Sequence, residues 1–329
     1  MVDQHRTANV SERTSEAPQL RPLVAVVGPT GSGKRALALH LAQSFQGEIV
    51  NCDSLQLYRY LDIGTAKPLP AERGAVPHHL FDLLDPDQVF TAGEYERAAR
   101  PLLGQIAARG NLPIVAGGTG FYLRSLLEGL CPGPPRSDRL RARLARRESL
   151  HPGWLHATLA RFDPSSAARI HPADVQKLIR AVEVLLSTRE PLSAWCERGR
   201  DPIPGFRTLK LGLDPPRDAL YERLDARLDG MFAGGLLDEV RNVFALGFPA
   251  TSKALEAHGY KQAIQVLRAE IGLQEAVVLA KRNTRRYAKR QWTWFRRDPE
   301  VLWISGFGDE PAAQQAAQAA TTEFLAHSM

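Results

Sequence analysis

Leu23-Val-Ala-Val-Val-Gly28-Pro-Thr-Gly-Ser-Gly-Lys34-Arg35 is the stretch that decides the fold. A short β-branched run ends at Gly28, a glycine-rich loop follows, and residues 35–44 then have the helical spacing of apolar side chains. The loop fits the pattern G-x-x-x-x-G-K, in which glycines let several backbone N–H groups point at one anion and a helix N-terminus adds partial positive charge. The stretch therefore predicts a strand, a phosphate-binding loop from Gly28 to Arg35, and a helix.

Position 35 departs from the pattern. It normally holds a Ser or Thr whose hydroxyl binds Mg²⁺, and this chain has Arg35. A guanidinium has donors only and cannot ligate a cation. Other groups then hold the metal, or Arg35 neutralises phosphate charge, or its side chain points to solvent. The segment before Gly117 also lacks the terminal aspartate of a Walker-B strand. Both features weaken a nucleotide-hydrolysing interpretation.

Strands and helices alternate outward from this loop. Residues 48–53, 112–116, 207–213 and 301–304 have the character of short strands. Residues 90–109 have helical spacing, with Thr91 as N-cap and Glu94 in the capping-box position. This alternation predicts an α/β fold, a P-loop NTPase-like parallel sheet flanked by helices.

The pattern changes after Gly129. A Pro-rich linker leads into residues 138–199, which have helical patterns and no convincing strand. We therefore predict a P-loop α/β core formed by residues 21–129 and 206–308, and a helical insertion of residues 130–205. Residues 1–20 are polar and aperiodic, typical of a flexible tail. Residues 309–329 are predicted to form a C-terminal helix or tail.

Composition favours a cytoplasmic protein with an anionic partner. The net charge of +6 points weakly in that direction, because the distribution of charge matters more than its sum. The N-terminal residues lack a secretory apolar segment, and no apolar run is long enough to cross a bilayer. Cys52, Cys131 and Cys196 lie far apart, so we expect neither a disulfide framework nor a zinc site. The His78-His79 pair also indicates no metal site, since neighbouring side chains of a strand face opposite sides.

A basic segment near the C-terminus indicates a nucleic-acid partner. Residues 281–297 contain eight Lys or Arg among seventeen residues. At helical spacing they form two stripes, and contact with an RNA backbone is favoured over a merely solvated face. Most aromatic residues of the segment are expected to pack onto the core instead. The stripes consist of Arg282, Arg286 and Arg290, and of Lys281, Arg285 and Lys289. The insertion adds Arg136, Arg139, Arg141, Arg143, Arg146 and Arg147.

Asp53 follows the second predicted strand. It is therefore expected at the carboxyl edge of the sheet beside the phosphate loop, where open α/β sheets bind ligands. Taken alone, a strand-end aspartate is more often a turn former or N-cap than a catalytic group.

Several blocks in order resemble the tRNA dimethylallyltransferase (tRNA isopentenyltransferase) family, and they extend from residue 23 to about residue 304. The blocks are Gly28–Lys34, Asp53-Ser-Leu-Gln-Leu-Tyr58, Leu61-Asp-Ile-Gly-Thr-Ala-Lys-Pro68, Val115-Ala-Gly-Gly-Thr-Gly-Phe-Tyr-Leu123, Arg169-Ile-His-Pro-Ala-Asp-Val-Gln-Lys-Leu-Ile-Arg180, His258-Gly-Tyr-Lys261 and Thr284-Arg-Arg-Tyr-Ala-Lys-Arg-Gln-Trp-Thr-Trp-Phe-Arg296.

The resemblance implies transfer of a dimethylallyl group from dimethylallyl diphosphate to the exocyclic N6 of the adenosine 3′-adjacent to the anticodon in tRNA. It makes Asp53 the general base and gives Thr30 and Lys34 catalytic roles. It implies Mg²⁺ as cofactor, with unknown protein ligands, and tRNA contacts in the helical insertion. We expect a monomer. The implied diphosphate-binding residues are Gly28, Pro29, Thr30, Gly31, Ser32, Gly33, Lys34 and Arg35. The implied tRNA-binding residues are Asp53, Ser54, Leu55, Gln56, Thr119, Arg141, Gln176, Lys177, Leu178, Ile179, Arg180, Glu256, Ala257, His258, Gly259, Tyr260 and Lys261.

Three alternatives compete with this interpretation. A small-molecule P-loop kinase would need a Ser or Thr at position 35, which is absent. A prenyltransferase acting on free adenine nucleotides is chemically closer, but the basic insertion and residues 281–297 favour a polymeric acceptor. A non-enzymatic RNA-binding module would leave Gly28–Lys34 beside Asp53 without a purpose.

Overall fold

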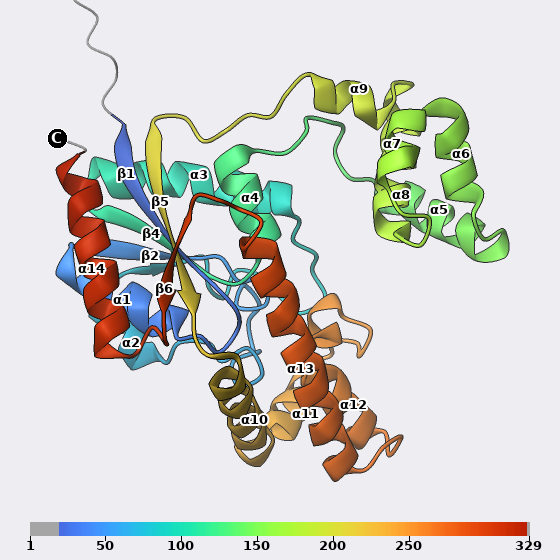
Figure 1. Ribbon diagram of the computed structural model, residues 1–329. Helices are drawn as coiled ribbons and strands as arrows, with labels where there is room; N and C mark the ends of the chain where they lie inside the picture. The colour runs from blue at the N-terminus through green and yellow to red at the C-terminus, as the bar shows by residue number, and fades with distance from the viewer. Residues whose placement is uncertain (1–19, 328–329) are drawn as a thin grey trace, which may run out of the picture. The chain divides into compact units, whose positions relative to one another are not determined.

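The computed structural model describes residues 20–327 (Figure 1). The predicted N-terminal tail therefore lies almost entirely outside the described residues. The chain divides into two compact units. One unit comprises the residues up to Val89, Leu102–Gly120, and those from Pro204 onward; the other comprises Phe90–Pro101 and Phe121–Ile203. None of the helices in the described range is both long and apolar enough to cross a membrane.

A six-stranded parallel sheet forms the centre of the first unit, which confirms the predicted fold class. The strand order is β3-β2-β4-β1-β5-β6. The chain crosses from β1 over β4 to β2, whereas β5 lies on the other side of β1, so the loop after β1 sits where the strand order reverses. The strands are β1 (Arg21–Val27), β2 (Gly47–Asn51), β3 (His78–His79), β4 (Leu112–Ala116), β5 (Phe206–Asp214) and β6 (Val301–Ser305).

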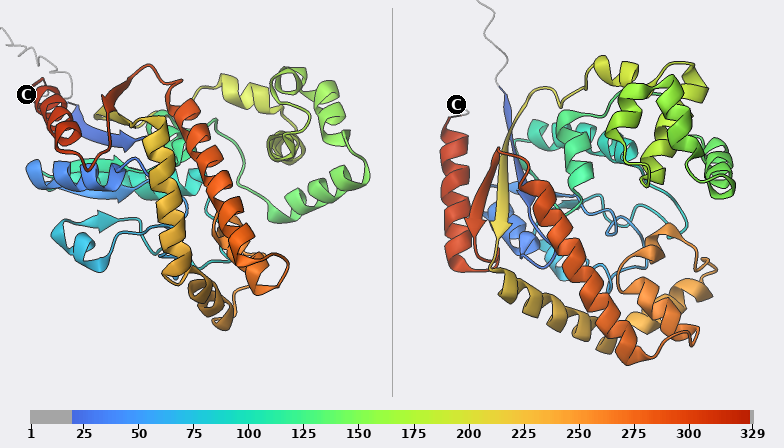
Figure 2. Two further views of the ribbon diagram at one scale, coloured as in Figure 1. Left: turned by 60° about the horizontal axis from the view of Figure 1, so that its bottom comes forward. Right: turned by 45° about the vertical axis from the view of Figure 1, so that its right-hand side comes forward.

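The helices of this unit lie on the sheet and beyond its carboxyl edge. They are α1 (Lys34–Ser44), α2 (Pro70–Ala75), α10 (Arg217–Ala233), α11 (Leu236–Ala245), η1 (Lys253–Glu256), α12 (Tyr260–Leu267), α13 (Leu273–Phe295) and α14 (Pro311–Ala326). Helices α10 and α13 run side by side (Figure 2). Two further helices, α3 (Ala92–Ala108) and α4 (Gly120–Glu128), carry residues of both units.

One face of the sheet is covered by α1 and α14 (Figure 1). Val24 and Val26 of β1 point to this face, because alternate residues of a strand share a side, and they join the apolar cluster of Leu37 and Leu41 from α1. The predicted C-terminal helix is α14, whose small buried residues allow close approach to α1. Helix α14 thus closes the core over α1, β5 and β6.

The second unit is helical between Asp138 and Glu197. It is larger than the predicted insertion of residues 130–205, because residues 90–101 and 121–129 belong to it as well. Its core contains Leu155, Leu159 and Val182. Its helices are α5 (Asp138–Leu150), α6 (Trp154–Phe162), α7 (Pro164–Arg169), α8 (Val175–Thr188) and α9 (Leu192–Glu197). The N-terminus of α3 has the predicted capping box, in which Thr91 N donates to Glu94 Oε2 and Glu94 N donates to Thr91 Oγ1.

The expectation of no disulfide is wrong. Cys131 and Cys196 are bridged, with their Cα atoms 4.8 Å apart and a sequence separation of 65. No spacing motif indicates this pair, because only the folding of the intervening helices brings the two ends of the insertion together. Cys52 is a free, buried thiol.

Candidate active site

The phosphate loop has the left-handed backbone that its glycines permit. Gly31 and Gly33 have φ angles of 81° and 88°, and α1 begins immediately afterwards at Lys34. A Cβ on Gly33 would lie 2.6 Å from the backbone nitrogen of Gly308, so the loop also packs too closely for any side chain there. Ser32 joins the loop to the segment after β6, since its carbonyl accepts a hydrogen bond from Gly308 N.

A cavity of about 320 Å³ opens in front of this loop. Thr30, Gly31, Gly33, Lys34 and Arg35 line it, whereas Gly28, Pro29 and Ser32 do not. Asp53 lines the same cavity, as do the apolar side chains of Ile49, Pro68 and Phe81. The spatial requirement of the sequence hypothesis, an anion-binding loop and a carboxylate facing one space, is therefore met.

Lys34 is the cation of the loop. Its Nζ donates a hydrogen bond to the carbonyl oxygen of Pro29 at 2.7 Å. Burial lowers the pKa of Lys34 to about 8, Asp53 opposes the change, and Arg227 adds to it. The lysine is therefore a cation at neutral pH that releases its proton far more readily than an exposed one.

Helix α10 supplies two cations that the sequence analysis did not identify. Arg227 Nη2 donates to Thr30 Oγ1 at 2.9 Å, and burial lowers the pKa of this partly buried guanidinium. Arg223 also lines the cavity and is held by Asp309 at 2.8 and 2.9 Å. Thr30 and Arg227 are 197 residues apart in sequence, so no local pattern could have indicated the pair.

Asp53 lies in a turn just beyond β2. The strand was predicted to reach Asp53 but ends at Asn51, because the Asn51 side chain then takes over the backbone hydrogen bonds. Asn51 Oδ1 accepts from Asp53 N, and Asn51 Nδ2 donates to the carbonyls of Asp53 and Leu80. Asp53 Oδ1 accepts from Leu55 N at 3.0 Å. The carboxylate is thereby oriented within its own turn.

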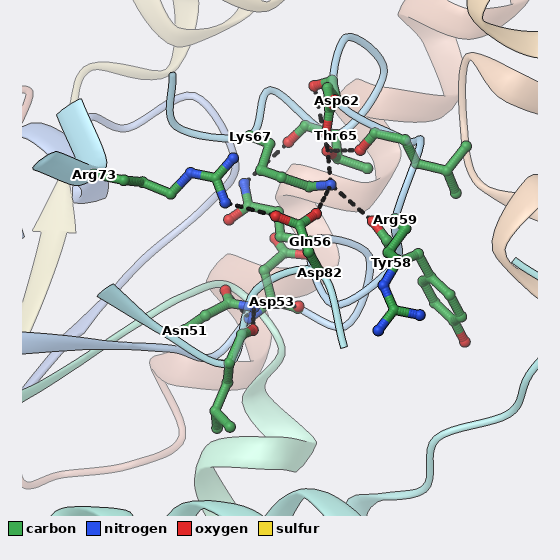
Figure 3. A network of polar contacts seen from close by, with 12 residues as sticks. Asn51, Asp53, Gln56, Tyr58, Arg59, Asp62, Thr65, Lys67, Arg73 and Asp82 are labelled. Atoms are coloured by element: carbon green, nitrogen blue, oxygen red, sulfur yellow. Dashed lines mark hydrogen bonds and ion pairs between the residues drawn. The ribbon is translucent and has the colours of Figure 1, made fainter. Parts of the chain in front are cut away.

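A polar network holds the segment that follows Asp53 (Figure 3). The side chain of Lys67 is buried, and its Nζ contacts Tyr58 O at 2.7 Å, Asp82 Oδ1 at 2.7 Å and Asp62 Oδ1 at 2.6 Å. Gln56 Nε2 donates to Thr65 O at 3.1 Å. Because Gln56 and Thr65 line the cavity, this network fixes one of its walls.

The other predicted contacts around the turn are close by. Thr119 Oγ1 accepts from Ser54 N at 3.0 Å, and Thr119 N donates to Cys52 O at 3.1 Å. Tyr287 of α13 lies near Asp53, and burial, followed by the charge of Asp53, raises the pKa of its phenol. His78 was assigned no role, yet it lines the cavity, and burial lowers the pKa of its imidazole.

The segment of predicted tRNA contacts from Glu256 to Lys261 divides into exposed and buried side chains. Glu256 and Lys261 are exposed, and Ala257, His258 and Gly259 lie in the turn between η1 and α12. Tyr260 is fully buried.

The hydroxyl of Tyr260 donates to Glu239 Oε1 at 2.6 Å, and the same carboxylate accepts from the backbone nitrogens of Asp62, Ile63 and Gly64. Burial raises the pKa of Tyr260 well above its ordinary value. The assignment of this side chain to the tRNA surface needs correction, because it instead joins α12 to the 62–64 turn.

In the second unit, three predicted contacts surround one buried carboxylate. Glu183 is fully buried, and its Oε2 accepts from Arg141 at 3.1 Å and from Arg180 at 3.0 Å. Arg141 also donates to Gln176 Oε1 at 3.3 Å. Glu183 thus holds these side chains together, and sequence reasoning missed it.

The remaining contacts predicted on α8 differ in exposure. Lys177 is exposed and pairs with Asp174 at 2.5 Å. Leu178 and Ile179 belong to the core of the unit, so their assignment as tRNA contacts is corrected as well.

The two basic stripes of α13 have different surroundings. Lys281 pairs with Asp229 of α10, and Arg285 pairs with Asp225 of α10. Arg282, Arg286 and Arg290 are exposed along the helix. Among the aromatic residues of α13, Phe295 is buried, as expected, whereas the side chain of Trp294 remains 38% exposed. Lys289 of the second stripe is exposed as well, so the basic side chains of α13 available to a polyanion are Arg282, Arg286, Lys289 and Arg290.

The cavity lining contains few oxygen groups for a magnesium ion. Such an ion needs carboxylate or hydroxyl oxygens. Among the described residues that line the cavity, the only carboxylate is Asp53, and Arg35 has donors alone. The hydroxyls of Thr30 and Thr65 also line it, but they are engaged with Arg227 and with the carbonyl of Leu61. Arg35 forms an ion pair with Glu72, with 3.4 Å between Arg35 Nη2 and Glu72 Oε1. In residues 20–327 there is also no cluster of three His, Cys, Asp or Glu residues that could bind a metal.

Comparison with known proteins gives a consistent result. The profile of the family described as IPP transferase matches residues 56–298, and that of isopentenyl transferase matches residues 22–81. A tRNA dimethylallyltransferase of Solibacter usitatus is 58% identical over 92% of this chain and 99% of its own.

Solved structures agree. The crystal structure of a full-length tRNA isopentenylpyrophosphate transferase from Bacillus halodurans has a TM-score of 0.68 at 35% identity, covering 94% of this chain and 96% of its own. A eukaryotic dimethylallyltransferase captured acting on tRNA has a TM-score of 0.82 at 27% identity, covering 93% of this chain and 80% of its own.

Proposed function

Because this chain belongs to the IPP transferase family of tRNA dimethylallyltransferases, we propose that it prenylates tRNA. The group transferred is dimethylallyl, the donor is dimethylallyl diphosphate, and the acceptor is the exocyclic N6 of the adenosine 3′-adjacent to the anticodon. The observation that carries the proposal is the shared cavity, which is lined by both the phosphate loop and Asp53.

The donor half of the cavity suits an allylic diphosphate. As the bond between C1 of the dimethylallyl group and the diphosphate oxygen breaks, negative charge grows on the leaving group. Preorganised N–H groups and cations aimed at that charge lower the barrier. The loop supplies N–H groups, and the cavity is lined by the cations of Lys34, Arg35, Arg223 and Arg227. The apolar side chains of Ile49, Pro68 and Phe81 offer a surface for the hydrocarbon.

The acceptor half needs a base more than a strong nucleophile. The lone pair of an adenine amine is delocalised into the ring, which makes the amine a weak nucleophile. The allylic carbon compensates for this weakness, because it carries positive charge as the diphosphate leaves. When the N–C bond forms, the amine proton becomes acidic and passes to Asp53, so positioning matters more than a tuned pKa. The target adenosine must leave its stack to reach this depth, and exclusion of water protects the donor from hydrolysis.

Cationic side chains of the cavity neutralise the negative charge of the diphosphate. Since Arg35 replaces the usual hydroxyl and Asp53 serves as the base, any Mg²⁺ in the reaction would depend on oxygens of the diphosphate and water rather than on protein ligands. The acceptor tRNA would lie against Arg282, Arg286 and Arg290 and against the arginines of the second unit. We also propose a monomer acting in the cytoplasm.

The test is to supply radiolabelled dimethylallyl diphosphate with one acceptor at a time. We expect label in tRNA and none in AMP. Label in AMP would favour a nucleotide prenyltransferase. Transfer of the terminal phosphate of ATP to a sugar acceptor, with no label in tRNA, would favour a kinase.

A further inference from the structure

Gln291 is a buried polar residue on α13 to which neither the sequence nor the proposed reaction assigns a role. It is 5% exposed. Its Oε1 accepts a hydrogen bond from the backbone nitrogen of Thr30 at 2.7 Å, and its Nε2 donates to the carbonyl oxygen of Gly118 at 2.8 Å. One side-chain amide therefore joins the phosphate loop after β1 to the glycine loop after β4.

The glycine loop is shaped to receive this amide. A Cβ on Gly118 would lie 2.2 Å from Gln291 Nε2, and a Cβ on Gly120 would lie 2.2 Å from the ring of Trp294. On the opposite side, a Cβ on Gly117 would lie 2.1 Å from the carbonyl oxygen of Cys52. The backbone of the loop thus packs directly against side chains of α13 and against the backbone of Cys52, the residue preceding Asp53.

The contact continues to the catalytic turn. Thr119 follows Gly118, and its nitrogen and hydroxyl hold Cys52 O and Ser54 N, the backbone atoms on either side of Asp53. Gln291 is consequently hydrogen-bonded to Thr30 directly. It is linked to the Asp53 turn through Gly118 and the neighbouring Thr119.

Helix α13 is anchored on both sides of Gln291, so the side chain of Gln291 is attached to a fixed support. Trp292 Nε1 donates to Asp214 Oδ1 at 2.7 Å, and Arg296 Nη2 contacts the same carboxylate at 2.9 Å. Toward the other end, Arg285 pairs with Asp225. Thr30 is then held twice, at its backbone by Gln291 and at its hydroxyl by Arg227.

We propose that Gln291 is a positioning residue that sets the spacing between the phosphate loop and Asp53. This inference rests on the proposed function, because the spacing matters where a diphosphate leaves one side of a carbon while an amine loses its proton on the other. A displacement of about 1 Å in such an arrangement costs on the order of 10²-fold in rate. Gln291 touches no reacting atom, and its effect is exerted through Thr30 and Gly118.

The test is a double-mutant cycle on the intact chain with Gln291→Met and Asp53→Ala. Methionine keeps the volume and removes both hydrogen bonds. We expect kcat to fall by ~10–100-fold in the wild-type background, with KM for dimethylallyl diphosphate and for tRNA changed less than about threefold. In the Asp53→Ala background the further loss should be less than about threefold, because no base remains to be positioned.

Two further variants complete the experiment. Gln291→Glu keeps the acceptor for Thr30 N–H but removes the donor to Gly118 O, so it repeats the cycle if the methionine variant does not fold. Thr284→Val changes another buried polar residue of α13 and should leave kcat and the coupling unchanged.

Additive effects of the two substitutions, or a change confined to KM, would overturn the positioning role while leaving the prenyl transfer intact. If the wild-type protein consumes dimethylallyl diphosphate but attaches no label to tRNA, the proposed function is wrong, and this inference is wrong with it.

Discussion

Asp53 and Lys34 share one cavity but have opposite tasks at the scale of single residues. In the proposed reaction the carboxylate receives a proton, and the ammonium keeps one. Each is oriented by a neighbour in its own loop, Asp53 by Leu55 N and Lys34 by Pro29 O. Substitution of either group should therefore affect a different kinetic parameter.

Replacement of Asp53 by alanine should lower kcat by about 10²–10⁴-fold, the usual contribution of a positioned general base. Binding of tRNA, measured by filter retention or fluorescence, should change little because the carboxylate contributes little to a surface dominated by arginines. An equal loss in binding and turnover would mean that Asp53 maintains the turn rather than accepting the proton.

The pKa of Lys34 near 8 predicts a pH dependence of donor binding. Below this pKa the side chain is a cation that attracts diphosphate; above it the amine is neutral. Affinity for inorganic diphosphate should therefore fall as pH rises from 8 to 9, and bound diphosphate should move the transition upward because it favours the charged form. In Lys34→Arg the guanidinium stays charged, and the decrease should disappear. Calorimetric titration across this range would reveal a flat wild-type profile if Lys34 is not the group responsible.

Substitution of Arg35 tests how the reaction depends on magnesium. We expect turnover of the wild type to decrease less than that of Arg35→Thr when Mg²⁺ is removed with a chelator, because the threonine hydroxyl restores a metal ligand and removes a cation. Initial rates measured at a series of Mg²⁺ concentrations give the comparison. Identical magnesium dependence in both proteins would show that residue 35 does not contribute to neutralising the diphosphate.

Helix α13 combines three tasks at the scale of secondary structure elements. One side pairs with acidic residues of α10, one side carries Gln291 to the phosphate loop, and one side exposes Arg282, Arg286 and Arg290. The sequence indicates a basic helix, but it does not show which stripe forms ion pairs within the protein and which is exposed. The partners that distinguish them come from α10, about sixty residues earlier.

The two stripes should respond differently to neutralisation. Arg286→Gln should weaken tRNA binding and reduce the slope of log affinity against log salt by about 1, as expected for one lost phosphate contact. Arg285→Gln is the matched control: it breaks the pair with Asp225 and should alter the slope far less. Equal slopes for wild type and Arg286→Gln would place the RNA elsewhere.

Local sequence was sufficient for the elements that local chemistry determines. The strand ending at Gly28, the loop and α1 follow from an apolar run and three closely spaced glycines. The two-residue strand β3 could not be predicted, because it exists through pairing with β2. Gln291 is 261 residues from Thr30, and such a contact leaves no periodic signal in the chain.

The whole chain consists of two units with different supports. The first is closed by α14 over α1, β5 and β6, and the second is a small helical unit whose core is supplemented by the Cys131–Cys196 bridge. Small apolar cores contribute little stability on their own, so a covalent link has a proportionally larger effect in the second unit.

Removing the bridge should therefore destabilise the second unit under oxidising conditions. Closing a loop of this length, 65 residues, restricts the unfolded chain by roughly 4 kcal/mol in the chain-entropy description. We expect Cys131→Ser with Cys196→Ser to unfold at a lower temperature than the wild type in oxidising buffer, and the difference to vanish in reductant. Thiol alkylation followed by mass spectrometry supplies the control, because alkylation of Cys131 and Cys196 in the oxidised wild type would rule out the bridge. Since the bridge joins the two chain segments at the ends of the insertion, its loss should first be detected as faster hydrogen exchange in α5–α9, while protection of β1 and β4 stays unchanged.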